Sequence, residues 1–183
     1  MTMTRHTITG RAAGRAGELM VQSELERRGW STANLNTDHP NAPAYDILAW
    51  KGSTQILVDV KTVRPQYPRG MEKQGGAVKK GKAPTTAGIG RNEYTVFVFM
   101  AQERTSDQFY IIPTRVVRRV QAARWTDYYA SPKRNGQKKV VSGHLSLRWA
   151  PAPDGESRPG WGLATKWARY LGAWDALPKT AAC

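Results

Sequence analysis

Two charged side chains interrupt an apolar run in the stretch ILVDVKT, residues 56–62. Side chains of a strand alternate between its two faces, so Asp59 and Lys61 share one face while Val60 points to the other. One interpretation is an ion pair on a half-exposed strand. The other is half of a metal site, in which the carboxylate binds a cation and the lysine orients or helps to deprotonate a water molecule that attacks a phosphate.

A second carboxylate precedes this run. Asp46 begins the apolar stretch YDILAW, and the short KGS sequence between the two stretches predicts a hairpin. Adjacent strands lie about 4.8 Å apart, so the hairpin brings Asp46 close to Asp59. Two carboxylates in an apolar sheet repel each other and are costly to bury, and a divalent cation relieves both costs. Mg²⁺ prefers carboxylate and carbonyl oxygens, and the backbone carbonyl of Val60 can supply a further ligand.

A third carboxylate lies in the first expected helix, over residues 11–28. Val21 and Leu25 follow Glu18 at spacings of three and seven, so Glu18 borders an apolar stripe and is expected to face the sheet. The neighbouring GRAGE sequence is rich in glycine and would let another element approach closely. The alternative for Glu18 is an ordinary solvated charge on a helix surface.

The remaining elements are expected around one sheet. Apolar, β-branched and aromatic runs predict strands, and runs rich in Ala, Leu, Glu and Arg predict helices. The expected strands are 31–36, 45–50, 54–63, 93–101, 107–113 and 144–150, and the further expected helices are 114–125, with Thr114 as N-cap, and 161–174. This order predicts a mixed α/β or α+β domain with four or five strands in its sheet. Trp161, Trp167 and Trp174 would share one side of the last helix, where core or subunit-interface packing is the commoner role and base stacking the alternative.

The composition favours a polyanionic partner. The chain has 183 residues and a net charge of +14, which favours nucleic acid. No apolar run is long enough to cross a membrane and no secretory signal precedes the domain, so no membrane partner and a cytoplasmic, bacterial or phage-like protein are expected. Cys183 is the only cysteine, which excludes an internal disulfide framework.

A long basic loop is expected over residues 64–92, with seven Lys or Arg and one Glu. It is either a solvated linker or a flap that lies along phosphates. The arginines of 114–124 are likewise either a solvated helix face or backbone contacts. The residues expected to contact DNA are Arg15, Arg64, Arg69, Lys73, Lys79, Lys80, Lys82, Arg91, Arg118 and Arg119. His39 and His144 lack metal-ligand spacing and are expected to be structural or on the surface.

The order Glu18, Asp46 and Asp59-Val60-Lys61 resembles the PD-(D/E)XK nuclease superfamily. Over residues 11–65 the chain is most similar to archaeal Holliday junction resolvases, through GRAGELMVQSELERRGW and YDILAWKGSTQILVDVKTVR. Tyr45 stands where the motif's name has proline. The resemblance implies a restriction-endonuclease-like core, catalytic Glu18, Asp46, Asp59 and Lys61, and Mg²⁺, for which Mn²⁺ can substitute, on Asp46, Asp59, the Val60 carbonyl and Glu18.

The resemblance also implies a biological role. We expect a metal-dependent DNA endonuclease that acts on duplex or branched DNA as a homodimer, in recombination, repair or phage biology. Residues 1–125 would form the nuclease core, and residues 126–183 a basic C-terminal extension for dimer or DNA contacts. The alternatives are a nucleic-acid-binding or assembly module that does not cut, an exonuclease, and a ribonuclease.

Overall fold

The computed structural model describes residues 9–38, 45–63, 74–77, 83–101, 107–130, 136, 144–152 and 154–178. The chain divides into two compact units, and each is described by itself. The first comprises Met1–Tyr67, Asn92–Ile111 and Leu171–Cys183, and the second comprises Pro68–Arg91 and Ile112–Tyr170. The predicted division into a core of 1–125 and an extension of 126–183 stays a prediction about which part carries the chemistry.

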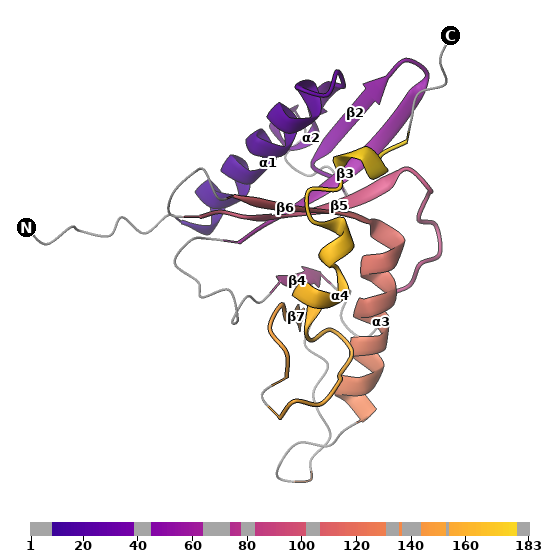
Figure 1. Ribbon diagram of the computed structural model, residues 1–183. Coiled ribbons are helices and arrows are strands. Elements are labelled where there is room, and N and C mark those ends of the chain that lie inside the picture. Colours follow the sequence, from indigo (N-terminus) through magenta and orange to yellow (C-terminus); the bar gives the residue numbers. More distant parts are fainter. Residues whose placement is uncertain are drawn as a thin grey trace, which may run out of the picture. The chain divides into compact units, whose positions relative to one another are not determined.

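A five-stranded mixed sheet forms the centre of the first unit (Figure 1). Its strand order is β1-β2-β3-β5-β6, where β1–β2 and β2–β3 pair antiparallel and β3–β5 pair parallel. The bounds are β1 Ser31–Asn34, β2 Ile47–Lys51, β3 Thr54–Val63, β5 Glu93–Phe99 and β6 Gln108–Pro113. The predicted α/β class with a mixed sheet of four to five strands is confirmed.

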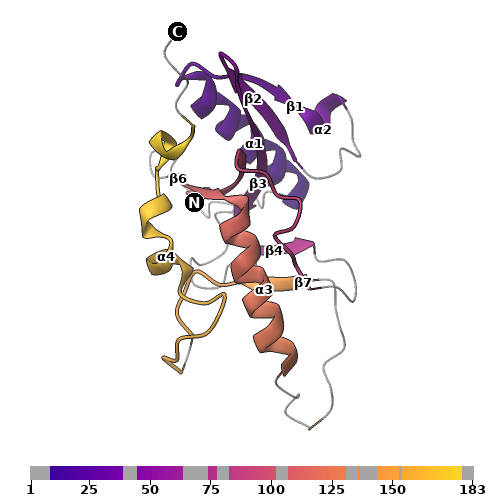
Figure 2. The ribbon, with the colours of Figure 1, turned by 90° about the vertical axis from the view of Figure 1, so that its right-hand side faces the viewer.

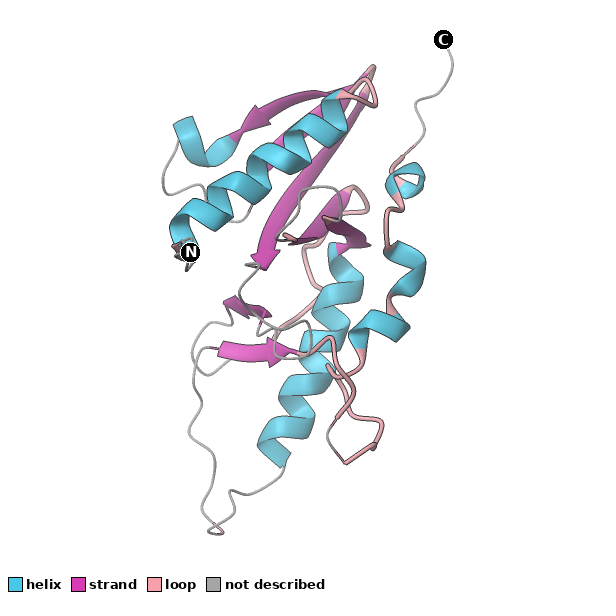
Figure 3. Ribbon diagram, turned by 60° about the vertical axis from the view of Figure 1, so that its left-hand side comes forward, coloured by secondary structure: helices cyan, strands magenta, loops and turns pink. Residues whose placement is uncertain are grey.

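Helix α1 (Gly10–Glu26) packs against β3 and β1 (Figure 3). Its N-cap Thr9 accepts a hydrogen bond from the backbone of Ala12, at 3.3 Å. The buried residues Ala13, Gly17, Val21 and Leu25 recur every four positions and so form one stripe. Val21 and Leu25 join the core made by the inward faces of the strands, so the helix is fixed to the sheet mainly by apolar burial.

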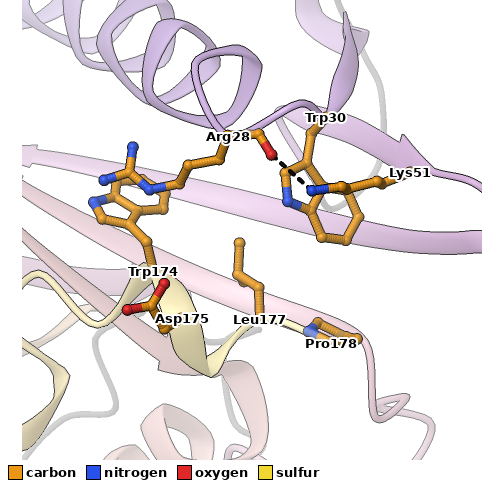
Figure 4. A pocket seen from close by; sticks show the side chains of 7 residues that line it. All are labelled: Arg28, Trp30, Lys51, Trp174, Asp175, Leu177 and Pro178. Carbon is orange, nitrogen blue, oxygen red and sulfur yellow. Dashed lines mark hydrogen bonds between the residues drawn. The ribbon is translucent and has the colours of Figure 1, made fainter. Parts of the chain in front are cut away.

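The segment Leu171–Pro178 returns to the first unit. Leu171 forms an antiparallel bridge with Tyr110, and both Trp174 and Leu177 are buried in the core. The Trp174 ring packs 5.6 Å from the Phe109 ring and 4.9 Å from the Arg28 guanidinium. Trp174 and Leu177 line a pocket of about 590 Å³. Figure 4 shows their side chains together with those of Arg28, Trp30 and Lys51.

The single helix predicted over 161–174 is wrong. The segment contains α4 (Leu163–Lys166), the 3₁₀ turn Ala168–Tyr170 and a further 3₁₀ turn at Trp174–Ala176. Gly162 and Gly172 have φ of 64° and 63°, a left-handed conformation that interrupts a helix and that glycine adopts without strain. Trp167 packs on Trp149 in the second unit, at 5.5 Å between ring centroids, so the tryptophans do not share one helix side.

The second unit contains α3 (Thr114–Ala130), which contacts β7 (His144–Leu147) (Figure 2). Strand β7 pairs antiparallel with β4 (Gln74–Ala77), a strand inside the segment predicted as an uninterrupted loop. Helix α3 continues five residues past the predicted end at 125, and Trp125 and Tyr129 pack one turn apart on this stretch, with tilted rings whose centroids are 4.5 Å apart. Thr114 is its first helical residue and is buried. In the part of the chain that the structure describes, no helix has the length and apolar character needed to cross a membrane.

Candidate active site

Asp46 lies beside the Asp-Val-Lys segment of β3. Its backbone N–H donates to the carbonyl of Val58 at 2.8 Å, and its carboxylate Oδ2 accepts the N–H of Val60 at 2.6 Å. These two bonds fasten Asp46 against the residues that flank Asp59. The hairpin predicted between residues 46 and 59 therefore brings Asp46 to the expected neighbourhood.

Hydrogen bonds from two asparagines connect Glu18 on α1 to the start of this hairpin. Asn34 Nδ2 donates to Glu18 Oε2 at 3.0 Å, and Asn36 Nδ2 donates to Glu18 Oε1 at 3.2 Å. The same Asn36 nitrogen donates to Asp46 Oδ1 at 2.6 Å. Glu18 is half-buried and bonded to the sheet side of the helix, so the interpretation as a solvated surface charge does not describe it.

A close helix–strand contact sets the height of Glu18 above the sheet. A Cβ atom placed on Gly17 would lie 1.9 Å from Thr62 Oγ1, closer than any two such atoms can approach. Only glycine lets α1 approach β3 this closely. The expectation that the GRAGE sequence permits close approach is confirmed at Gly17.

Asp59 and Lys61 form an ion pair on the open face of β3, with exposed side-chain fractions of 20% and 34%. The parallel register places Asp59 beside Thr95 and Lys61 beside Phe97, and both β5 residues are buried. The pair is thus shielded on the β5 side and open on the other, where a substrate group can reach the ammonium. A half-exposed ion pair and a catalytic pair share this geometry.

Sequence reasoning missed two groups near the site. One is the amide pair Asn34 and Asn36, for which the two-residue spacing in ANLN, just before the turn-rich segment, was the available signal. The other is Glu93, which accepts a hydrogen bond from the Tyr45 hydroxyl and lies beside Leu57 in the parallel register. The Tyr45–Glu93 bond ties the residue preceding Asp46 to β5. Tyr45, which replaces the proline of the motif, thus helps to position Asp46.

The donor set can be tested against a divalent metal. Among the described residues, no group of three or more His, Cys, Asp or Glu side chains lies close enough together to hold a metal ion. Mg²⁺ nevertheless needs only one or two carboxylates, since it keeps several of its waters. The carboxylates of Glu18 and Asp46 both accept hydrogen bonds from Asn36 Nδ2. Asp59 precedes Val60, whose N–H donates to Asp46. The chemistry of these oxygens fits Mg²⁺ or Mn²⁺.

The structure describes four of the ten residues predicted to contact DNA. Arg15, Arg91 and Arg119 are exposed, whereas Arg118 is half-buried and donates to Gln121 Oε1 at 3.1 Å. The other six, which all belong to the predicted flap, and one histidine lie outside the described residues: Arg64, Arg69, Lys73, Lys79, Lys80, Lys82 and His39.

Comparisons with known proteins give one likeness. No protein-family model matches the chain, and no curated protein matches it. A solved structure of a bacterial homing endonuclease, I-Ssp6803I, superposes with a TM-score of 0.44 at 15% sequence identity, over 92% of this chain and 91% of that chain. A likeness at this level assigns neither a family nor an activity.

Proposed function

We propose that the chain is a Mg²⁺-dependent DNA endonuclease with a PD-(D/E)XK-type site on a restriction-endonuclease-like core. The observation that carries the proposal is the set of hydrogen bonds around Asp46. These bonds join Asp46 through Asn36 to Glu18 on one side and fasten it to Val60, between Asp59 and Lys61, on the other. The bonds connect Glu18 on α1 and Asp46 just before β2 with Val60 on β3, whose neighbours in the sequence are Asp59 and Lys61.

The proposed reaction is hydrolysis of a phosphodiester by in-line attack of water on phosphorus, with departure of one bridging oxygen. The carboxylates of Asp46, Asp59 and Glu18 would hold a divalent ion, which would supply Lewis-acid stabilisation of the charge that develops on phosphate. Lys61 donates hydrogen bonds to the attacking water or to a non-bridging oxygen, because its ammonium lies on the open face of β3. Glu18 completes the carboxylate set and orients the water.

DNA binding is the second part of the proposal. The net charge of +14 and the exposed guanidinium groups of Arg15, Arg91 and Arg119 suit a phosphate backbone. Such contacts position the duplex without reading its sequence. Cutting both strands calls for two sites, so a homodimer is part of the proposal, and light scattering of the purified protein measures it directly.

The experiment compares cleavage of duplex, branched and single-stranded DNA in Mg²⁺ by the wild-type protein and by Asp59→Ala and Lys61→Ala. Both variants should lose cleavage by about a hundredfold or more and retain DNA binding. Asp175→Ala is the matched control, because Asp175 is an exposed carboxylate on the C-terminal segment. End-labelled and internally labelled substrates, with an RNA duplex alongside, separate an endonuclease from an exonuclease and from a ribonuclease.

One observation favours a second candidate, a nucleic-acid-binding module that does not cut. Within the described residues the carboxylates of the site already have protein partners, namely Lys61, Asn36 and the Val60 N–H, and no three-carboxylate cluster is formed. This candidate predicts that the wild-type protein binds DNA but leaves every substrate intact. Intact substrates with the wild-type protein, while DNA is bound, would replace the nuclease proposal; DNA binding by Asp59→Ala and Lys61→Ala is expected under both candidates.

A further inference from the structure

The Asn36 side chain uses one nitrogen to join two carboxylates. Its Nδ2 lies 2.6 Å from Asp46 Oδ1 and 3.2 Å from Glu18 Oε1. An amide nitrogen has two hydrogens, so both donors of Asn36 are committed to acidic oxygens. Glu18, Asn36 and Asp46 are all half-buried, which strengthens these charge-assisted bonds relative to bonds in open water.

The position of Asn36 Nδ2, between two carboxylates, favours positive charge. Two carboxylates within reach of a single atom repel each other unless a donor or a cation lies between them. The amide NH₂ carries only a partial positive charge and therefore offsets part of that repulsion. A divalent cation in the same place would offset it fully and would take oxygens of the same two residues as ligands.

The backbone around Asn36 is held by hydrogen bonds that do not involve the Asn36 side chain. Asn36 belongs to the short helix α2 (Leu35–Asp38), where Leu35 N–H donates to the Asp46 carbonyl at 2.8 Å. The N–H of Asn36 donates to Asn34 Oδ1 at 2.9 Å. Rotation about the side-chain bonds of Asn36 can therefore withdraw Nδ2 from the carboxylates without displacing α2.

We infer that Asn36 is a positioning residue whose amide nitrogen occupies the place of the metal between Glu18 and Asp46, and that a divalent cation binds by displacing it. The inference rests on the proposed metal-dependent function and deepens it. The amide keeps the two carboxylates together in the metal-free protein and competes with the metal for them. Metal affinity is therefore set in part by a neutral side chain.

The test measures Mn²⁺ binding alone, by the loss of the free-ion electron paramagnetic resonance signal, in the wild type, Asn36→Ala and Asn36→Asp. Removal of the competitor should tighten Mn²⁺ binding by about tenfold in Asn36→Ala. Asn36→Asp, which has nearly the same shape, adds acidic oxygens and should bind more tightly still. Gln22→Ala is the matched control, since Gln22 Nε2 on α1 donates a hydrogen bond to Thr32 Oγ1 at 3.3 Å and is not bonded to Glu18 or Asp46.

Each outcome decides a different question. Tighter binding in both Asn36 variants, with far-ultraviolet circular dichroism unchanged and Gln22→Ala like the wild type, supports the displacement. Equal or weaker Mn²⁺ binding in Asn36→Ala, beside measurable wild-type binding, overturns the displacement and leaves the metal-dependent function standing. No Mn²⁺ binding by any of the proteins overturns both.

Discussion

The substitution Gly17→Ala tests whether α1 approaches β3 as closely as the active-site geometry requires. The added methyl group would lie 1.9 Å from Thr62 Oγ1, with Thr62 Cβ and Cγ2 at 3.0 and 3.1 Å. Rotation of the Thr62 side chain does not relieve the contact fully, because Cβ itself lies 3.0 Å from the added methyl group in every rotamer. Relief therefore requires α1 and β3 to move apart, and Glu18 moves with α1.

The magnitude follows from two opposing terms. Overpacking at a buried contact costs about 1–3 kcal/mol, and the upper end applies because all three nearest atoms of Thr62 are too close. Alanine regains about 1 kcal/mol over glycine in a helix interior. We expect a net loss of about 2 kcal/mol in the free energy of unfolding of the first unit, which corresponds to about thirtyfold faster hydrogen exchange of protected amides.

The assay is hydrogen exchange of α1 and β3 followed by mass spectrometry, since a molecule of two units need not unfold in one step. Gly14→Ala is the control: nothing lies within 4 Å of the added Cβ, so this variant should gain about 0.5–1 kcal/mol. Gly17→Ala combined with Thr62→Ala should recover part of the loss, because Oγ1 and Cγ2 are then absent. If Gly17→Ala proved as stable as Gly14→Ala, the close contact, and with it the placement of Glu18, would be refuted.

Three further predictions concern the same unit and its charge. Lys51→Met removes the bond from Nζ to the Arg28 carbonyl at the end of α1 (2.9 Å) and should cost about 1 kcal/mol in urea unfolding, and no loss would show that the bond is not formed in solution. Trp174→Ala should cost about 3–5 kcal/mol and speed exchange of the core strands, whereas exchange at the wild-type rate would mean that the C-terminal segment is not part of that core. DNA affinity should fall by about a thousandfold between about 50 and 200 mM salt, measured by fluorescence anisotropy, if six or so phosphates are contacted, and a flat salt response would contradict charge-driven binding.

The sheet was predictable because its strands have strong local signals. Residues 47–51 and 54–63 are apolar, partly β-branched runs separated by a short turn, and 93–99 is almost wholly apolar. Strand β4 was not predictable, since its sequence QGGA has little strand propensity and the strand exists through its pairing with β7. The last helix was overextended because the aromatic spacing favoured a helix, whereas α4 begins only after the left-handed Gly162, ends at Lys166, and is separated from the 3₁₀ turn at Trp174 by the left-handed Gly172.

The four acidic and basic residues of the candidate site could be found from order and spacing, because a hairpin has few ways to arrange two neighbouring strands. Asn36 could not be found in this way. Its role depends on α2 turning back to the carbonyl of Asp46, a contact between residues eleven apart that no periodicity encodes. Glu93 was missed likewise, because parallel pairing with β3 joins segments that the sequence separates by a long loop.

The bridge between Tyr110 and Leu171 has a consequence for how the protein is made. Ribosomes synthesise the chain from its N-terminus, and Trp174 and Leu177 belong to the core that α1, β2, β3 and β5 begin. The first unit therefore lacks two of its core side chains until the whole of the second unit has been synthesised. During that interval Arg28 and Trp30, which line a pocket with Trp174 and Leu177, lack these two neighbours and remain open to other proteins. We expect chaperones that recognise apolar surface to bind nascent chains that end before residue 174.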